Sequence, residues 1–298
     1  MTARVEAEGL VLAPIAIRTP ARFRPRKLLE NAFWYLLLTS FAIVTVFPFA
    51  WMLMTSLKGP ADAIVSVPPQ FIPTDPTLEN YARVLRQLPL VSFFTNSMVA
   101  SLAVTLLNTL LAALAAYPLA KMRFRGRTVI FWLLLATLIV PAQLTYIPSF
   151  ILAVNAFHYY DTLAALLFPN LVSAFNIFLL RQAFRSVPRD LMDAARVDGA
   201  SEFRIWRSIM LPVVRPTLAA VAIFTFVTSW NDFLWPSLML HTRANMTLPV
   251  GLAALQGVFS SDFRATAAGV TMTVIPILIF FVLVQRVFVR GLSGAVKG

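Results

Sequence analysis

The 298-residue chain is 59% hydrophobic but only 13% charged, about half the charged fraction of an average soluble domain, so its composition indicates a membrane protein. It contains no cysteine, which excludes disulfide and thiolate chemistry. The formal net charge of +12 would fit a nucleic-acid ligand, but the distribution of the basic residues along the chain argues against that class.

Long intervals without any Asp, Glu, Lys or Arg recur along the chain. Each approaches the roughly 20 apolar residues that a membrane-spanning helix needs. The fifth interval, which begins at residue 216, reaches this length only if Asp232 is tolerated within the helix. We therefore predict an all-α, polytopic membrane protein with six transmembrane helices, which cover about 31–56, 93–118, 128–153, 161–182, 216–238 and 265–288.

The basic residues predict the orientation in the membrane. With the N-terminus inside, the cytoplasmic segments hold 20 of the 25 Lys and Arg residues, as the positive-inside rule requires. Both termini and the polar interval 187–216, between helices four and five, are then cytoplasmic. Residues 1–27 are predicted to be a flexible basic tail, 28–290 the transmembrane domain, and 291–298 a cytoplasmic C-terminal tail.

The polar interval 187–216 has the pattern of a helix–turn–helix. Pro188 suits the first turn of a helix, Gly199 can end that helix in the left-handed conformation, and Ser201 can cap a second one. The first helix would place Leu191, Ala194, Ala195 and Asp198 on one face. The second would carry an apolar stripe of Phe203, Trp206 and Met210, widened by Ile205 and Ile209. This stripe can pack on its own chain, on the membrane interface or on a partner protein.

Several motifs resemble one family of transporters. The spacing of Asp193-Ala194-Ala195, Gly199, Ile209, Leu211 and Pro212 resembles the EAA loop of ABC importer permeases, with Asp193 where Glu is usual. Further similar motifs are NSMVAS at 96–101, AAYPLAK at 115–121, DGAS at 198–201, WNDF at 230–233, TLPVGL at 247–252 and the terminal GAVKG. From about residue 30 onward, the chain resembles the shorter of the two maltose-transporter-type permease subunits of carbohydrate ABC importers.

This resemblance implies a function and a set of partners. The chain would be a permease subunit in a bacterial or archaeal plasma (inner) membrane, forming half of the translocation path for a sugar or oligosaccharide. Its partners would be a second permease subunit in a heterodimer, two ATP-binding subunits and an extracytoplasmic substrate-binding protein. A polyol or glycerol phosphate is the alternative substrate, and an ATP-independent channel or carrier is the alternative mechanism.

The resemblance also implies which residues contact the ATPase subunits. The EAA loop would dock through Asp193, Ala194, Ala195, Asp198, Gly199, Ala200, Phe203, Trp206, Ile209, Leu211 and Pro212. Gly294 and Lys297 in the C-terminal tail are expected to contact the ATPase subunits as well.

The chain lacks the motifs of an enzyme. It has no G-x-x-x-x-G-K-[ST] phosphate loop, so ATP and Mg²⁺ are expected on the partner subunits, with no cofactor or metal on this chain. His158 and His241 lie on different predicted outer loops and are expected to be solvated.

Asp232 is the one acidic residue within a predicted transmembrane helix. It lies 16 residues after Pro216, which places it about 24 Å along the helix, near the outer interface. Asn231 and Asp232 are therefore candidates for the outer translocation path or its gate, and pairing with backbone groups is the alternative. Asn96, Asn108 and Asn176 are further path candidates, for which helix–helix hydrogen bonds are the alternative.

Overall fold

The computed structural model describes residues 25–64, 66, 70–258 and 262–295. Within these ranges the chain forms helices joined by loops and no β-strand, which confirms the all-α fold class. It divides into two compact units, Met1–Pro48 and Phe49–Gly298, and each is described here by itself.

The first unit consists, in its described part, of most of the first helix. α1 (Pro25–Ser56) is 32 residues long, contains Pro48, and continues into the second unit. It begins before the predicted start at 31, so residues 25–27 of the predicted flexible tail are helical. The remainder of that tail lies outside the described residues.

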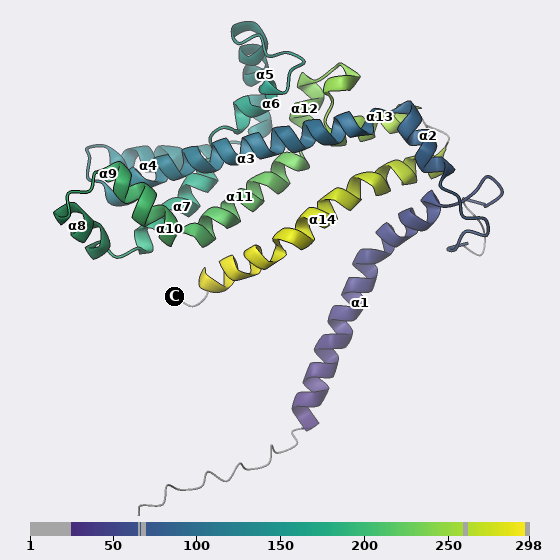
Figure 1. Ribbon diagram of the computed structural model, residues 1–298, viewed down its shortest axis with the longest axis horizontal. Coiled ribbons are helices and arrows are strands. Elements are labelled where there is room, and N and C mark those ends of the chain that lie inside the picture. The colour runs from purple at the N-terminus through teal and green to yellow at the C-terminus, as the bar shows by residue number, and fades with distance from the viewer. Residues whose placement is uncertain (1–24, 65, 67–69, 259–261, 296–298) are drawn as a thin grey trace, which may run out of the picture. The chain divides into compact units, whose positions relative to one another are not determined.

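The second unit is built around α3 (Leu90–Lys121), which packs against α7 (Ala174–Ser186) and α11 (Arg215–Trp230). α11 also packs against α14 (Phe263–Ala295), as Figure 1 shows. Small residues on α3 are buried against neighbouring helices, which lets the helices approach closely. They are Ala100, Ser101, Ala112, Ala113 and Ala116.

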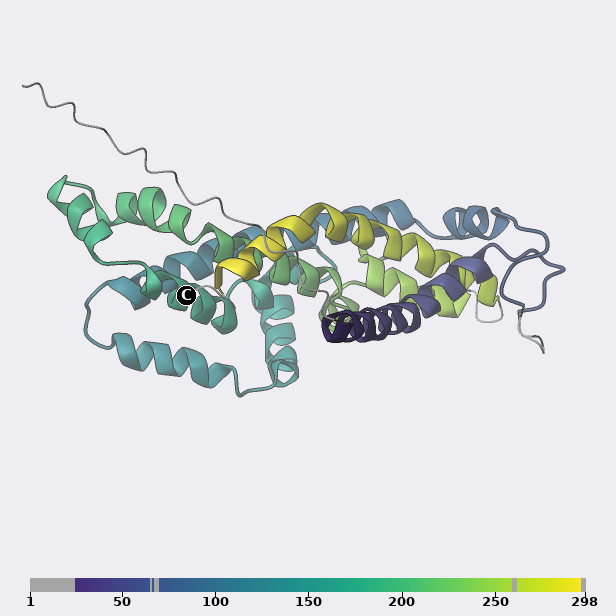
Figure 2. The same ribbon diagram turned by 90° about the horizontal axis from the view of Figure 1, so that it is seen from below.

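The third predicted span is broken rather than continuous. α4 (Arg127–Thr137) is followed by α5 (Ala142–Ile151) and the π-helical turn η1 (Leu152–Ala156), with a bend of 96° between the two parts. Figure 2 shows this change of direction. Pro141 stands at the bend, where it lacks an N–H for the helix and disfavours helical backbone in the residue before it.

The fourth predicted span is also broken. α6 (Ala164–Leu167) and η2 (Phe168–Asn170) meet α7 at a bend of 56°. Ser173 has extended backbone at this break, and its Oγ accepts a hydrogen bond from the Asn176 N–H at 3.3 Å, which caps α7.

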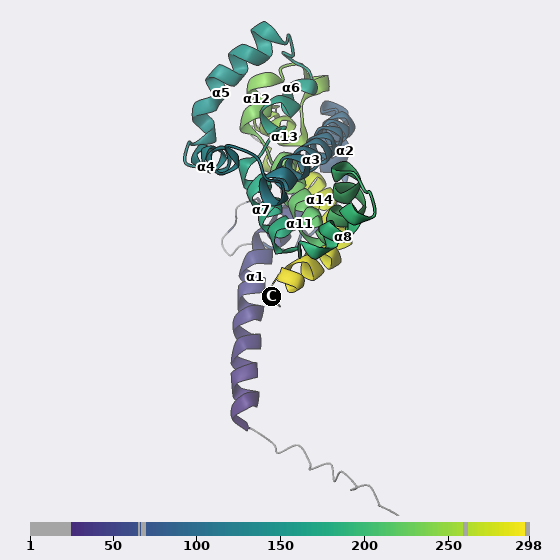
Figure 3. The ribbon, with the colours of Figure 1, turned by 90° about the vertical axis from the view of Figure 1, so that its left-hand side faces the viewer.

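The fifth predicted helix, 216–238, is interrupted near its end. α11 ends at Trp230, and residues 231–233 separate it from α12 (Leu234–Met239). α5, α6 and α12 lie together beside α3, as the views in Figures 1 and 3 agree.

Shorter helices complete the end of the second unit at which α3 begins. α2 (Glu79–Gln87) packs on α14, and Arg83 forms an ion pair with Asp262 just before α14. η4 (Arg243–Asn245) and α13 (Leu248–Val258) connect α12 to α14 and also contact α3.

α14 corrects the prediction for the C-terminus. It contains Pro276 and runs to Ala295, so residues 291–295 of the predicted tail, including Gly294, are helical. Lys297 lies outside the described residues.

Three helical segments are long and apolar enough to span a membrane alone: 30–56, 90–121 and 263–282. Three bent pairs pass the same test only when their two parts are combined. The described residues therefore give three spans, or up to six if each pair is one span, and the six-span topology stays a prediction.

Candidate functional site

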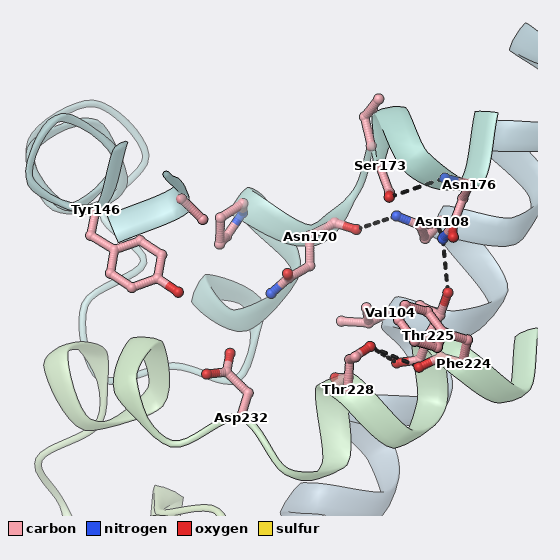
Figure 4. A pocket seen from close by; sticks show the side chains of 14 residues that line it. Val104, Asn108, Tyr146, Asn170, Ser173, Asn176, Phe224, Thr225, Thr228 and Asp232 are labelled. Carbon is pink, nitrogen blue, oxygen red and sulfur yellow. Dashed lines mark hydrogen bonds between the residues drawn. The ribbon is translucent and has the colours of Figure 1, made fainter. Parts of the chain in front are cut away.

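A pocket of about 490 Å³ opens at the places where the predicted spans are broken (Figure 4). The break at Pro141 contributes residues that follow it, the break before α7 contributes 169–173, and the end of α11 contributes Asp232. The pocket is lined by amides, hydroxyls, aromatic rings, aliphatic side chains and one carboxylate: Val104, Asn108, Ala142, Tyr146, Pro169, Asn170, Val172, Ser173, Asn176, Phe224, Thr225, Thr228, Ser229 and Asp232. Irregular backbone at membrane depth is tolerated where it lines such a cavity.

A network of buried amides joins α3, α7 and α11 beside the pocket. The Asn176 Nδ2 donates to Asn108 Oδ1 at 2.6 Å and to Thr225 Oγ1 at 2.9 Å. Asn108 Nδ2 in turn donates to the Asn170 carbonyl at 2.7 Å (Figure 4). Asn108 and Asn176 therefore form the helix–helix hydrogen bonds that were the alternative to a path role, and both also line the pocket.

The Asn176 side chain is 3% exposed, and its Oδ1 has no hydrogen-bond partner among the described residues. A buried acceptor without a donor is costly, and Asn176 is one of the residues that line the pocket.

Among the residues that the structure describes, Asp232 is the only charged one that lines the pocket. Its side chain and that of Tyr146 both point into the pocket in Figure 4. Asn231 is not among the lining residues, and its Nδ2 donates to the Val227 carbonyl at 2.8 Å. Asn96 is also elsewhere, since its Nδ2 donates to the carbonyls of Ala244 and Met246.

The sequence analysis missed most of the lining, including Tyr146, Ser173, Phe224 and Thr225, because it treated the spans as continuous helices. The signals that could have found the breaks were Pro141 and Pro169.

The interval 187–216 is a helix–turn–helix, as predicted. Its elements are α8 (Asp190–Val197), α9 (Glu202–Ile205), the π-helical turn η3 (Trp206–Met210) and α10 (Leu211–Val213). The first helix begins at Asp190, slightly later than Pro188. Figure 1 places α8 and α9 near the end of α3 that lies opposite α2.

The turn has the predicted backbone chemistry. Gly199 has a φ of +76°, which favours glycine. Its N–H donates to the Arg196 carbonyl at 3.0 Å, and the Ala200 N–H donates to the Ala195 carbonyl at 2.9 Å, which is a Schellman motif. Ser201 Oγ accepts from the Arg204 N–H at 3.3 Å and so caps α9.

Part of the predicted docking face packs on the chain itself. Ile205, Trp206 and Met210 are buried, and the Trp206 indole N–H donates to the Ala113 carbonyl of α3 at 3.3 Å. Met192 and Ala195 are buried beside them, whereas Leu191 is exposed. Ala195 and Trp206 thus lie beneath the exposed face and hold the loop to the membrane helices.

The remaining predicted docking residues are accessible. Phe203 is 60% exposed, although its side chain is large and apolar. Asp193, Ala194, Asp198 and Gly199 are exposed around it, and Ala200, Ile209, Leu211 and Pro212 are partly exposed. Exposed apolar groups bordered by polar residues are typical of a protein interface.

Arg196 connects the two helices of this loop. Its Nη1 lies 2.8 Å from Asp193 Oδ1, and its Nε lies 2.8 Å from Glu202 Oε1. Glu202 Oε2 also accepts a hydrogen bond from the Tyr117 hydroxyl of α3 at 2.7 Å. The hydrogen bond from Arg196, followed by that from Tyr117, lowers the pKa of the Glu202 carboxyl.

Asp161, which the sequence analysis did not single out, joins two loops that are far apart in the sequence. Its Oδ1 accepts hydrogen bonds from the N–H groups of His241 at 2.8 Å and Thr242 at 3.0 Å. The hydroxyl of Thr242 and these backbone donors lower the pKa of Asp161 to about 2. His158 and His241 are both exposed, as expected. Among the described residues, no group of His, Asp and Glu has the arrangement of a metal site.

Comparisons with known proteins agree on one family. The family model described as "Binding-protein-dependent transport system inner membrane component" matches residues 108–294. An arabinooligosaccharide transport system permease of Halalkalibacterium halodurans is 35% identical, covering 86% of this chain and 93% of the relative. A diacetylchitobiose uptake system permease of Streptomyces coelicolor is 35% identical, covering 88% of this chain and 85% of the relative. A lactose transport system permease of Rhizobium radiobacter is 32% identical, covering 91% of this chain and 98% of the relative.

A solved structure shares the fold. A chain of a bacterial ABC transporter that imports the acidic polysaccharide alginate matches with a TM-score of 0.75 and 24% identity, covering 90% of this chain and 99% of that one.

Proposed function

Because the chain belongs to the family of binding-protein-dependent transport system inner membrane components, we propose that it forms half of the translocation path of a sugar or oligosaccharide ABC importer. The observation that carries this proposal is the pocket at the helix breaks, which combines amides, hydroxyls and aromatic rings inside a membrane protein. These groups can donate and accept hydrogen bonds with sugar hydroxyls, and Tyr146 offers a flat apolar surface.

The charge of the pocket bears on the alternative substrates. Asp232 is its only charged lining residue, so a glycerol phosphate would bring negative charge toward an uncompensated carboxylate. A neutral saccharide has no such penalty. The named substrates of the relatives, arabinooligosaccharides, diacetylchitobiose and lactose, support a neutral sugar.

The partner subunits follow from this assignment. A second, related permease subunit would complete the path, and an extracytoplasmic binding protein would deliver the substrate. Two ATPase subunits would bind ATP and Mg²⁺ and dock on the exposed face of the EAA loop, which centres on Phe203. Gly294 and Lys297 near the C-terminus would add contacts to them.

The buried side of the EAA loop provides a route for coupling. Movement of an ATPase subunit against Phe203 would be passed through Ile205 and Trp206, which are packed rigidly against α3. Because α3 shares the amide network with α7 and α11, the pocket is connected mechanically to the loop.

The test is reconstitution of the chain with its partner subunits and binding protein in vesicles. ATP-dependent uptake of a labelled neutral oligosaccharide is expected, and glycerol phosphate should not compete with it. Uptake that continues without ATP and ATPase subunits would establish a carrier instead. Competition by glycerol phosphate would contradict the substrate assignment.

A further inference from the structure

A second pocket, of about 410 Å³, lies on the cytoplasmic side, where the end of α3 meets the EAA loop. Two segments that are far apart in the sequence form this pocket. One is the end of α3 with the turn that follows it, and the other is α8 with the start of α9. The lining residues are Lys121, Met122, Arg123, Arg189, Met192, Asp193, Arg196 and Glu202.

The two carboxylates in this pocket are already engaged. Asp193 and Glu202 both bind the guanidinium of Arg196, each at 2.8 Å, and Glu202 also accepts from Tyr117. Arg196 therefore pairs with both carboxylates, and their negative charge is directed toward its guanidinium.

The other three cations of this pocket have no anionic partner among the described residues. Lys121 is only 8% exposed, and its Nζ donates to the Val187 carbonyl. Within the described part of the chain, no carboxylate forms an ion pair with Lys121, Arg123 or Arg189. A buried ammonium without a counter-charge is costly, and two exposed guanidinium groups line the same cavity.

We propose that this pocket binds a phosphate group, supplied by an anionic phospholipid headgroup or by a soluble phosphate. Arginine forks match phosphate oxygens in a bidentate way, and lysine adds a point charge. Lys121 is the last residue of α3, at the predicted inner end of its span, which is the depth at which lipid phosphates lie. This inference does not depend on which substrate is transported.

A bound phosphate would also have a mechanical effect. Lys121 and Arg123 come from the end of α3, whereas Arg189 belongs to the EAA loop. An anion held between them would fasten the loop to α3, in addition to the contacts that Glu202 makes with Arg196 and Tyr117. The concentration of the anionic lipid or of phosphate would then affect the coupling between ATPase movement and the membrane helices.

The experiment uses the full complex with its partner subunits. Native mass spectrometry counts phosphatidylglycerol retained by the wild type, by the double variant Arg123→Gln/Arg189→Gln, and by the control Arg125→Gln/Arg204→Gln. The control removes the same charge from the same two segments, but neither residue lines the pocket. We expect phosphatidylglycerol binding to weaken about 10-fold or more in the first variant and to stay at the wild-type level in the control.

A second arm distinguishes the sources of the phosphate. Inorganic phosphate is titrated calorimetrically into the same complexes in phosphatidylcholine nanodiscs. Binding of phosphate with no preference for phosphatidylglycerol would support a soluble ligand. Equal phosphatidylglycerol retention in all three proteins together with no phosphate binding would overturn the proposal. A second result would also overturn it: the double variant alone loses the ATPase subunits while its lipid retention is unchanged. A carboxylate of the ATPase partner would then be the group that fills the pocket.

Discussion

At the scale of single residues, Glu202 connects the EAA loop to α3, because it binds both Arg196 and Tyr117. Its folded-state pKa is lowered from 4.5, so the stabilisation it contributes is present above pH 4.5 and is lost as the pH falls below that value. We expect hydrogen exchange in α8 and α9, corrected for the intrinsic rate, to accelerate as the pH falls below about 4.5.

Two variants separate the contributions to this pH dependence. Glu202→Gln cannot ionise and should exchange faster at pH 7 with little further change in acid. Tyr117→Phe keeps the ion pair with Arg196 and should retain most of the pH dependence. An unchanged pH profile in Glu202→Gln would show that another carboxylate is responsible.

Asp232 is the residue at which we expect function and folding to separate. Its carboxylate points into the pocket and is partly exposed, so Asp232→Asn should leave the yield and thermal stability of the complex near the wild-type values. Transport of the neutral sugar should fall by about 10-fold or more, equivalent to the loss of one hydrogen bond to a charged group. Asn231→Ala is the matched control, because Asn231 is adjacent but bonds only to its own helix. Normal transport with a reduced yield of Asp232→Asn would reverse the assigned role.

At the scale of elements, the turn at Gly199 offers a test of docking. Gly199→Val would place a branched residue at a φ of +76°, at a cost of about 1–2 kcal/mol, and no atom lies within 4 Å of the added Cβ. We expect membrane insertion and pairing of the permease subunits to persist while ATPase co-purification or coupling decreases. Gly126→Val is the control, since Gly126 also has a positive φ and open space but lies in the turn before α4. Equal losses in both variants would assign the effect to backbone strain alone.

The two alanines of the EAA loop should respond differently to enlargement. Ala194 is exposed, so Ala194→Leu should reduce ATPase association with little effect on stability. Ala195 is buried against Ile205 and its neighbours, so Ala195→Leu should destabilise the loop by about 1–3 kcal/mol through overpacking. Co-purification and thermal unfolding of both variants provide the comparison. Normal ATPase binding by the Ala194→Leu variant would show that the docking face is assigned wrongly.

At the scale of the whole second unit, the amide network fixes three helices to one another. Asn176→Ala would leave the side-chain Oδ1 of Asn108 without its donor, at a cost of about 1–3 kcal/mol. We expect a lower unfolding temperature for this variant, whereas Asn96→Ala should affect only the segment around η4. A wild-type unfolding temperature for Asn176→Ala would show that the network is not needed for stability.

Composition, charge intervals and turn chemistry are local properties, and the sequence by itself therefore determined the membrane class, the helical fold, the family and the turn at Gly199–Ser201. The sequence analysis predicted six continuous helices from six apolar intervals. Hydropathy shows the length and polarity of an interval, but it does not show where the helix axis changes direction. Only the tertiary structure decided that Pro141, Ser173 and Trp230 mark breaks, since a break inside a bundle depends on neighbouring helices that satisfy the freed backbone groups. Those breaks bring Tyr146, Asn176 and Asp232 into one pocket. Packing against α3 likewise decided that Trp206 faces inward and Phe203 outward, because helical periodicity gives a stripe but not its partner.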